Sequence, residues 1–419
     1  MTMEKEYYNI SEVADILSVS KETLRRWDKN GKLEPIRHPI NNYRVYHRTQ
    51  LSDFEEAQLM FNTLWDEELT TKPLRKYKSI ELFAGAGGLA LGFEKAGLDA
   101  ILLNEIDKFA CQTLRQNRPS WNVVEGDVSK LDFTKYKGKI DILSGGFPCQ
   151  AFSYAGKKLG FEDARGTLFF EFARAVKECE PTIFLAENVR GLLKHDEGRT
   201  LASIKSVIED IGYELITEPN VLKAIFYQVP QKRERLFFVG VRKDIMEKIS
   251  SNDFRWPSPY KRIMTMKDAL KKGDLYNSDV PDSAGQQYPK RKKEILDLVP
   301  AGGYWKDLPD DLQREYMQKS YFLGGGKTGM ARRLSYDEPS LTLTCAPAQK
   351  QTERCHPEET RPLTVREYAR IQTFPDDWEF AGSTTNQYKQ IGNAVPVNLS
   401  YAVARSLVRL LNTIEITNK

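Results

Sequence analysis

The sequence contains little cysteine, little histidine and no long apolar run. Its 419 residues include five cysteines and four histidines, and the cysteines form no CxxC pair. Disulfide frameworks are typical of short, cysteine-dense secreted chains, so we expect none in this protein. Cys345, Cys355 and His356 lie near one another, but their spacing and the missing fourth ligand argue against zinc, so we expect no metal.

The hydropathy of the sequence indicates neither a membrane span nor a secretory signal. No apolar run approaches the ~18 residues of a membrane span, and the first residues, MTMEKEYYNI, lack the apolar region of a secretory signal. We expect a cytoplasmic protein without a membrane partner. The net charge of +4 identifies no partner, but residues 21–48 hold eight Lys/Arg and only three Asp/Glu, and residues 289–293 read PKRKK. Two basic clusters favour a polyanionic partner.

Residues 7–54 predict a helix, a short turn and a basic helix. Ser11 is the expected N-cap of the first helix, with Ala14 at N3 and hence no capping box. The second helix covers residues 21–30 and ends at Gly31, and residues 41–48 alternate like the strand of a wing. This unit resembles excisionase and MerR-type winged helix-turn-helix domains, which implies DNA contacts. A small helical interaction module is the alternative. The candidate DNA contacts are Lys21, Arg25, Arg26 and Arg44.

From Lys78 onward, short apolar runs alternate with helical stretches. The runs are SIELF, AILLNEID, IDILSGG, TIFLAENV and RLFFVGV. Buried strands separated by helices predict an α/β fold with a Rossmann-like, mostly parallel sheet and helices on both faces. Residues 250–360 are irregular, and the end of the chain predicts an amphipathic helix.

The segment ELFAGAGGLALGFEKAG predicts a strand, a glycine turn and a helix. Gly85, Gly87 and Ala90 fit the relaxed dinucleotide fingerprint. Glu105 and Asp127 follow the next two strands, where carboxylates can bind ribose hydroxyls or an adenine amino group. The pattern indicates an adenosine-containing cofactor and does not discriminate NAD from S-adenosylmethionine.

A lone thiol follows the next strand, in GGFPCQAFS. Pro148 restricts the turn before Cys149, which lies at the carboxyl edge where open α/β sheets bind ligands. Glu187 ends another strand, where poor solvation raises a carboxyl pKa and suits a general acid. Arg233 and Arg235 point to one face if their segment is extended.

Residues 78–412 resemble the bacterial DNA cytosine C5-methyltransferases. The resemblance rests on ordered motifs: LFAGAGGLALGFEKAG, NEID, GDVS, GGFPCQAFS, RGTLFFEFAR, ENVRG, QVPQKRERLFFVG, RPLTVREYARIQTFPDDW and QIGNAVPVN. It implies S-adenosylmethionine as cofactor and addition of Cys149 to cytosine C6. Glu187 would act at N3, and Arg235, supported by Arg233, would bind the O2 edge. The target base would leave the duplex.

The resemblance also assigns the cofactor site and the domains. The implied cofactor residues are Phe83, Gly85, Gly87, Glu105, Ile106, Asp127, Pro148, Leu168 and Asn393. The expected domains are a winged helix-turn-helix (1–55), a linker (56–77), a catalytic domain (78–250), a target recognition domain (251–386) and a C-terminal return (387–419). Arg332 and Arg333 are candidates for guanine contacts.

Three other interpretations stay open at this point. An NAD-dependent oxidoreductase explains the glycine loop and Glu105, but not FPCQ, ENV and QKRER together. A tRNA cytosine-5 methyltransferase shares the cysteine motif. A transcription regulator would use the N-terminal domain on a promoter. We expect double-stranded DNA as partner, a monomeric enzyme with dimerisation through the N-terminal domain as an alternative, and a cognate restriction endonuclease.

Overall fold

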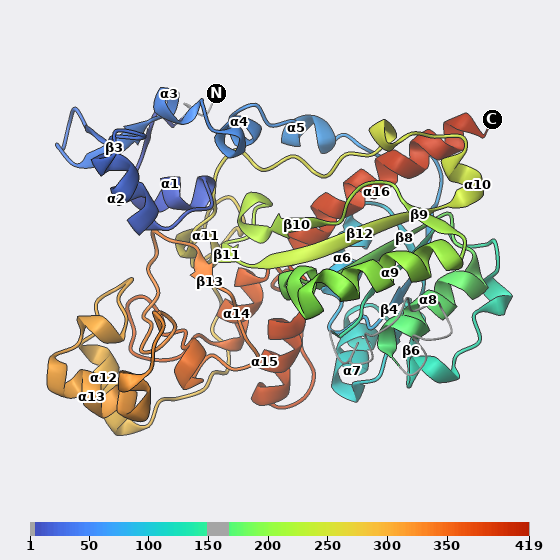
Figure 1. The fold of residues 1–419 in the computed structure, drawn as a ribbon. Helices are drawn as coiled ribbons and strands as arrows, with labels where there is room; N and C mark the ends of the chain where they lie inside the picture. Colours follow the sequence, from blue (N-terminus) through green and yellow to red (C-terminus); the bar gives the residue numbers. More distant parts are fainter. Residues whose placement is uncertain (1–4, 149–166, 419) are drawn as a thin grey trace.

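A twisted, mostly parallel sheet forms the centre of the molecule (Figure 1). The computed structural model describes residues 5–148 and 167–418. The parallel strands are β4 (Lys78–Leu82), β5 (Asp99–Glu105), β6 (Val123–Glu125), β7 (Ile142–Gly146) and β8 (Ile183–Val189). β12 (Glu234–Arg242) runs antiparallel to β8 and pairs with β10 (Asn220–Lys223) and β9 (Tyr213–Leu215). The order is β10-β12-β8-β7-β4-β5-β6, which confirms the predicted α/β class.

Helices cover both faces of this sheet because its central strands are apolar on both sides. Phe184 and Leu185 are adjacent in β8 and lie in different core clusters, as the alternation of a strand requires. One face packs against α6 (Gly88–Lys95) and α16 (Val397–Thr417), and the other against α8 (Leu168–Cys179) and α9 (Arg199–Asp210). α7 (Lys108–Asn117) follows β5, and α10 (Lys243–Met246) follows β12.

The N-terminal domain is a small three-stranded sheet with helices around its own core. Its elements are β1 (Tyr7–Tyr8), α1 (Ile10–Ile16), α2 (Lys21–Lys29), β2 (Ile36–Arg37), β3 (Arg44–His47), α3 (Arg48–Leu51) and α4 (Glu55–Phe61), with strand order β1-β3-β2. α5 (Trp65–Glu68) lies in the linker that follows, and its Trp65 packs in the core of the main sheet. The predicted N-cap is wrong. Asn9 caps α1 by accepting from the backbone N–H of Ser11 and Glu12, and Glu12 completes a capping box that the sequence prediction had excluded.

Residues beyond β12 build a smaller domain that remains joined to the sheet. Its elements are α11 (Met266–Leu270), α12 (Lys290–Asp297), α13 (Asp310–Met317), β13 (Ser340–Leu341), α14 (Val365–Ile371) and α15 (Thr384–Asn393). β13 pairs in parallel with β11 (Gln231–Lys232). α14 and α15 share an apolar core with Ala84 and Ala86 of the glycine loop. Among the helices described, none is long and apolar enough to cross a membrane.

Candidate active site

The glycine loop between β4 and α6 depends on left-handed backbone. Gly85 and Gly87 have φ of 55° and 88°, and the non-glycine residue Phe83 has φ of 58°. A Cβ on Gly87 would lie 2.8 Å from Leu114 Cδ2, and one on Gly88 would lie 2.2 Å from the Val395 carbonyl oxygen. The loop therefore requires small residues both for its conformation and for close packing.

Glu105 holds this loop from the end of β5. Its carboxylate accepts the Gly85 N–H at 2.7 Å, and the N–H groups of Ile106 and Asp107 at 2.8 Å each. The Ile106 side chain lies open at the rim, 70% exposed. Asp127, after β6, accepts the Ser129 N–H at 2.9 Å, and the hydrogen bond from this amide lowers its pKa. Two acidic side chains that accept backbone N–H groups thus follow neighbouring strands of the sheet.

A cavity of about 1080 Å³ opens at the carboxyl ends of the parallel strands. It brings together most residues predicted for the site: Phe83, Gly85, Glu105, Ile106, Asp127, Pro148, Leu168, Glu187, Arg233, Arg235 and Asn393. Gly87 lies outside the lining, at the N-cap of α6. Cys149 lies outside the described residues, so the structure follows its strand as far as Pro148.

A buried ion pair joins β8 to β12 in this cavity. Arg235 Nε lies 2.7 Å from Glu187 Oε1, and both side chains are largely buried. Burial raises the pKa of Glu187, while Arg235 and Arg233 oppose the shift. Gly146 faces Glu187 in the sheet, and a Cβ on Gly146 would lie 2.7 Å from Glu187 Oε2. The glycine before the cysteine motif therefore leaves the space that this carboxyl occupies.

Arg233 has a different place from its neighbour Arg235. It is 1% exposed and donates to the carbonyl oxygens of Leu343 at 3.2 Å and Gly392 at 2.8 Å. Burial and the nearby Arg235 guanidinium lower its pKa. These contacts tie the smaller domain to the wall of the cavity.

The segment leading to Cys149 is fixed from two directions. Phe147 packs against Phe169 and Phe172, with ring centroids 5.1 and 5.8 Å apart. Asn188 Nδ2 donates to the Phe147 carbonyl oxygen at 2.9 Å. Asn188 therefore holds the end of β7, a role that its place beside Glu187 in the sequence did not by itself reveal.

Sequence reasoning also missed several residues that line the cavity. Glu81 of β4 is buried, its Oε2 atom has no hydrogen-bond partner among the residues that the structure describes, and burial and then Glu105 raise its pKa. The Cys345 thiol donates to Asn393 Oδ1 at 3.2 Å, and Lys389 forms an ion pair with Asp107 at 3.0 Å. In the sequence, Glu81 lies within an apolar run and has no feature that marks it as a site residue. Cys345 lies outside all the motifs named above.

The structure corrects one of the two predicted guanine contacts. Arg333 is 4% exposed and donates to the Leu296 carbonyl oxygen at 2.9 Å and the Thr360 hydroxyl at 2.6 Å. A side chain enclosed in this way braces the smaller domain, so we no longer assign it to DNA. Arg332 lies 3.6 Å from Glu338 in a partly buried ion pair.

The candidate DNA contacts of the N-terminal domain lie on or beside α2. Arg25 and Arg44 are more than half exposed and pair with Glu22 at 3.1 Å and Asp28 at 3.6 Å. Arg26 is exposed as well. Lys21, at the first position of α2, binds Glu338 of the smaller domain at 2.8 Å. The basic face thus remains open except at the N-terminal end of α2.

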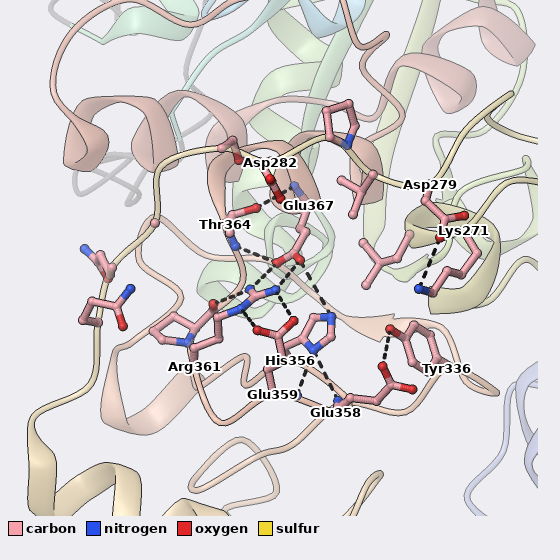
Figure 2. Close-up of a pocket in the computed structure, with 18 residues that line it drawn as sticks. Lys271, Asp279, Asp282, Tyr336, His356, Glu358, Glu359, Arg361, Thr364 and Glu367 are labelled. Carbon is pink, nitrogen blue, oxygen red and sulfur yellow. Dashed lines mark hydrogen bonds and ion pairs between the residues drawn. The ribbon is translucent and has the colours of Figure 1, made fainter.

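A second cavity, of about 430 Å³, lies in the smaller domain (Figure 2). Its polar groups bind one another. Glu367 accepts two hydrogen bonds from Arg361 at 2.8 Å each, and His356 Nδ1 accepts the N–H groups of Glu358 and Glu359 at 3.3 and 3.1 Å. This network fixes the start of α14. Within residues 5–148 and 167–418, no group of three or more His, Cys, Asp or Glu side chains could hold a metal ion.

The sheet, the glycine loop, its two carboxylates and the buried Glu187–Arg235 pair define an enzyme of the Rossmann-like methyltransferase class. Residues 77–409 match the model of the C-5 cytosine-specific DNA methylase family, and the chain belongs to that family. It is therefore a DNA (cytosine-5)-methyltransferase. Residues 9–46 match the model of the MerR family regulatory protein.

Curated relatives match nearly the whole chain. The Type II methyltransferase M.Eco47II of Escherichia coli is 69% identical over 99% of this chain and 98% of its own length. M.PspPI of Psychrobacter sp. is 60% identical over 98% of both chains, and M.Sau96I of Staphylococcus aureus is 46% identical over 96% of this chain and 88% of its own length.

Solved structures share the fold. A prophage-encoded protein from E. coli is 29% identical, with a TM-score of 0.56 over 80% of this chain and 100% of its own. Spodoptera frugiperda DNMT2 is 17% identical, with a TM-score of 0.56 over 79% of this chain and 99% of its own.

Proposed function

We propose that this enzyme transfers the methyl group of S-adenosylmethionine to C5 of a cytosine that has been turned out of a specific duplex DNA sequence. One observation carries the proposal: the buried Glu187–Arg235 pair lines the same cavity as the glycine loop, Glu105 and Asp127. The cavity thus has one side suited to an adenosine group and another suited to the polar edge of a pyrimidine.

The residues of the cavity fit S-adenosylmethionine. Glu105 and Asp127 offer carboxylate oxygens for ribose hydroxyls and the adenine amino group. Glu81 contributes a buried oxygen that no described residue binds, and Asn393 lines the cavity next to Ala394 and Val395, which pack on the glycine loop at Gly88. When bound, this cofactor supplies an electrophilic methyl group.

Catalysis rests on activating the cytosine. The Cys149 thiolate adds to C6 while Glu187 gives a proton to N3, so that C5 becomes enamine-like and can accept the methyl group. Arg235 stabilises negative charge at the O2 edge. A base, with water as the carrier, then removes the C5 proton, the Cys149–C6 bond breaks to release the thiolate, and N3 returns its proton to Glu187.

The physiological setting proposed is a restriction–modification system. The relatives named above are Type II methyltransferases, which supports methylation of host DNA at the site of a cognate endonuclease. The enzyme would act as a monomer in the cytoplasm. C6 is enclosed by base stacking in a duplex, so the target cytosine must leave the helix before Cys149 can reach it.

Bisulfite sequencing of DNA from cells that express the chain tests this proposal. We expect protected cytosines at one sequence context with the wild type and none with Cys149→Ser. Methylation of tRNA instead of duplex DNA in parallel assays would contradict the DNA assignment. Binding of labelled NAD in place of S-adenosylmethionine would contradict the cofactor assignment.

We further propose that the N-terminal domain binds DNA independently, at the promoter of its own gene. The match of residues 9–46 to the MerR family and the exposed basic face of α2 support this second function. Arg25→Ala with Arg26→Ala should abolish retardation of the promoter fragment while methylation of target DNA continues. Promoter binding that survives both substitutions would contradict it.

A further inference from the structure

The N-terminal domain is attached to the methyltransferase at the small β11–β13 sheet (Figure 1). Asp15 of α1 forms an ion pair with Lys232 of β11 at 2.6 Å, and the Asp15 side chain is 11% exposed. Glu338, just before β13, accepts hydrogen bonds from Lys21 at 2.8 Å and from the Ser11 hydroxyl at 3.1 Å. α1 therefore contacts β11 through Asp15, and α1 and α2 together bind Glu338, two residues before β13.

The two strands lead directly to the wall of the active site. Lys232 precedes Arg233, whose guanidinium donates to the carbonyl oxygen of Leu343, just beyond β13. Gln231 adds a second link, because its side-chain oxygen accepts the Leu343 N–H at 2.9 Å. Arg235, which pairs with Glu187, follows two residues after Arg233. A shift of β11 against β13 would therefore move the groups that face the cytosine.

Further contacts make this attachment firm. Ile263 of the chain after β12 packs against the apolar core of the N-terminal domain. In the linker, Glu68 accepts from the Ser258 N–H at 3.1 Å and from its hydroxyl at 2.9 Å. Burial raises the pKa of Asp15, and the Lys232 ammonium opposes this shift. Removing one partner of such a pair leaves the other charge poorly solvated.

We propose that Asp15, Lys21 and Glu338 are positioning residues for methyl transfer, and that the N-terminal domain acts as a clamp on β11 and β13. The clamp keeps Arg233 between Leu343 and Gly392 and so keeps Arg235 aligned with Glu187. This role uses the side of the domain that faces the enzyme, and it shares only Lys21 with the candidate DNA contacts of α2.

Steady-state methylation by Asp15→Asn and Glu338→Gln tests the clamp in the full chain. We expect kcat to fall about tenfold in each, because displacement of catalytic groups by a fraction of an ångström is costly, while KM for S-adenosylmethionine stays unchanged. Glu22→Gln is the matched control: it also removes one carboxylate from this domain, but Glu22 is 80% exposed and pairs with Arg25. It should keep the wild-type kcat.

The charge-swapped variant Asp15→Lys with Lys232→Asp separates positioning from folding. It restores an ion pair between the same positions and should recover most of the lost kcat. The effect of Asp15→Asn should also disappear in an Arg233→Ala background, since both act on the same alignment. Wild-type kcat in Asp15→Asn and Glu338→Gln would overturn the clamp and leave the methyltransferase function standing. Should Asp15→Asn not fold, failure of the swapped variant to methylate would overturn it.

Discussion

Glu187 is the residue on which the proposed cytosine chemistry most depends, because it is both buried and paired with Arg235. Glu187→Ala removes the proposed proton donor to N3 and leaves the Arg235 charge in a poorly solvated site. We expect kcat to fall by about 10² or more, the usual contribution of general acid catalysis, as measured by single-turnover methylation of a labelled duplex.

The neighbouring glutamate provides the control for that change. Glu234 pairs with the exposed Arg190 at 2.8 Å, so Glu234→Gln should leave kcat within twofold or so of the wild type, as expected for an exposed pair. Equal losses in the two variants would show that negative charge on this part of the sheet, rather than the Glu187 carboxyl in particular, determines the rate.

The surroundings of His356 predict that the free energy of unfolding depends on pH. Its Nδ1 accepts two backbone N–H groups and its Nε2 faces Glu367 at 3.7 Å, so the neutral ring fits the site (Figure 2). Burial lowers its pKa in the folded state, with Arg361 acting in the same direction and Glu367, Glu358 and Glu359 opposing. Below the unfolded value of about 6.5, the unfolded chain therefore binds the additional proton, and stability decreases as the pH falls.

Replacing His356 with asparagine tests this linkage. The Asn oxygen can accept the same amide groups but does not titrate, so His356→Asn should lose less thermal stability than the wild type between pH 7.5 and pH 5.5, roughly the range around the histidine pKa. Parallel decreases in Tm for the two proteins would assign the acid sensitivity to other groups.

At the scale of elements, α6 and α16 pack closely because Gly92 of α6 has no side chain where the two helices meet. A Cβ on Gly92 would lie 2.4 Å from Ser400 Cβ and 2.6 Å from the Ser400 backbone. Alanine favours helix by about 1 kcal/mol over glycine, but here the two helices would have to separate. We expect Gly92→Ala to lower the free energy of unfolding by about 1–3 kcal/mol, as overpacking of cores does, measured by urea denaturation. Gly273→Ala should be near neutral, because no atom of the neighbouring residues that the structure describes lies within 4 Å of the added Cβ.

The longer strands of the central sheet could be predicted from the sequence, because a single local pattern determines each of them. SIELF, AILLNEID, IDILSGG, TIFLAENV and RLFFVGV all form strands, because buried central strands are continuous apolar runs. The carboxyl ends of the parallel strands meet at one edge, so Glu105, Asp127 and Glu187 could be placed together in advance. The first residue of α1 could not be predicted in this way, because Asn9 and Ser11 are both good N-caps and the choice between them depends on the Glu12 side chain.

Contacts between distant segments were beyond prediction from one sequence. Arg333 looked like an exposed arginine of a basic segment, but its burial depends on Leu296 and Thr360, which only the folded domain brings near. In the same way, nothing in the basic pattern of α2 distinguishes Lys21, which binds Glu338, from Arg25 and Arg26. The ion pairs with the rest of the chain set the function of each side chain on this helix.

At the scale of the whole molecule, Lys21 connects the two regions for which we propose DNA contacts. It binds Glu338, which also lies 3.6 Å from Arg332 in the smaller domain. A Lys21 ammonium that binds a DNA phosphate cannot also bind this carboxylate at 2.8 Å. Under this proposal, engagement of α2 with DNA breaks one contact of the clamp, and the two proposed roles of the N-terminal domain oppose each other.

Glu338→Gln should release Lys21 and reveal this opposition. We expect affinity for promoter DNA that lacks a methylation target to increase about two- to fivefold, the equivalent of one partly exposed ion pair, together with a steeper salt dependence. Fluorescence anisotropy at two salt concentrations measures both. Glu315→Gln removes the same charge from the smaller domain, where Glu315 pairs with Arg291, and should bind like the wild type if the effect is local. An equal gain in affinity in both variants would show that the gain comes from the change in net charge. No gain in Glu338→Gln would show that Lys21 does not contact DNA, because its release from Glu338 then has no consequence for binding.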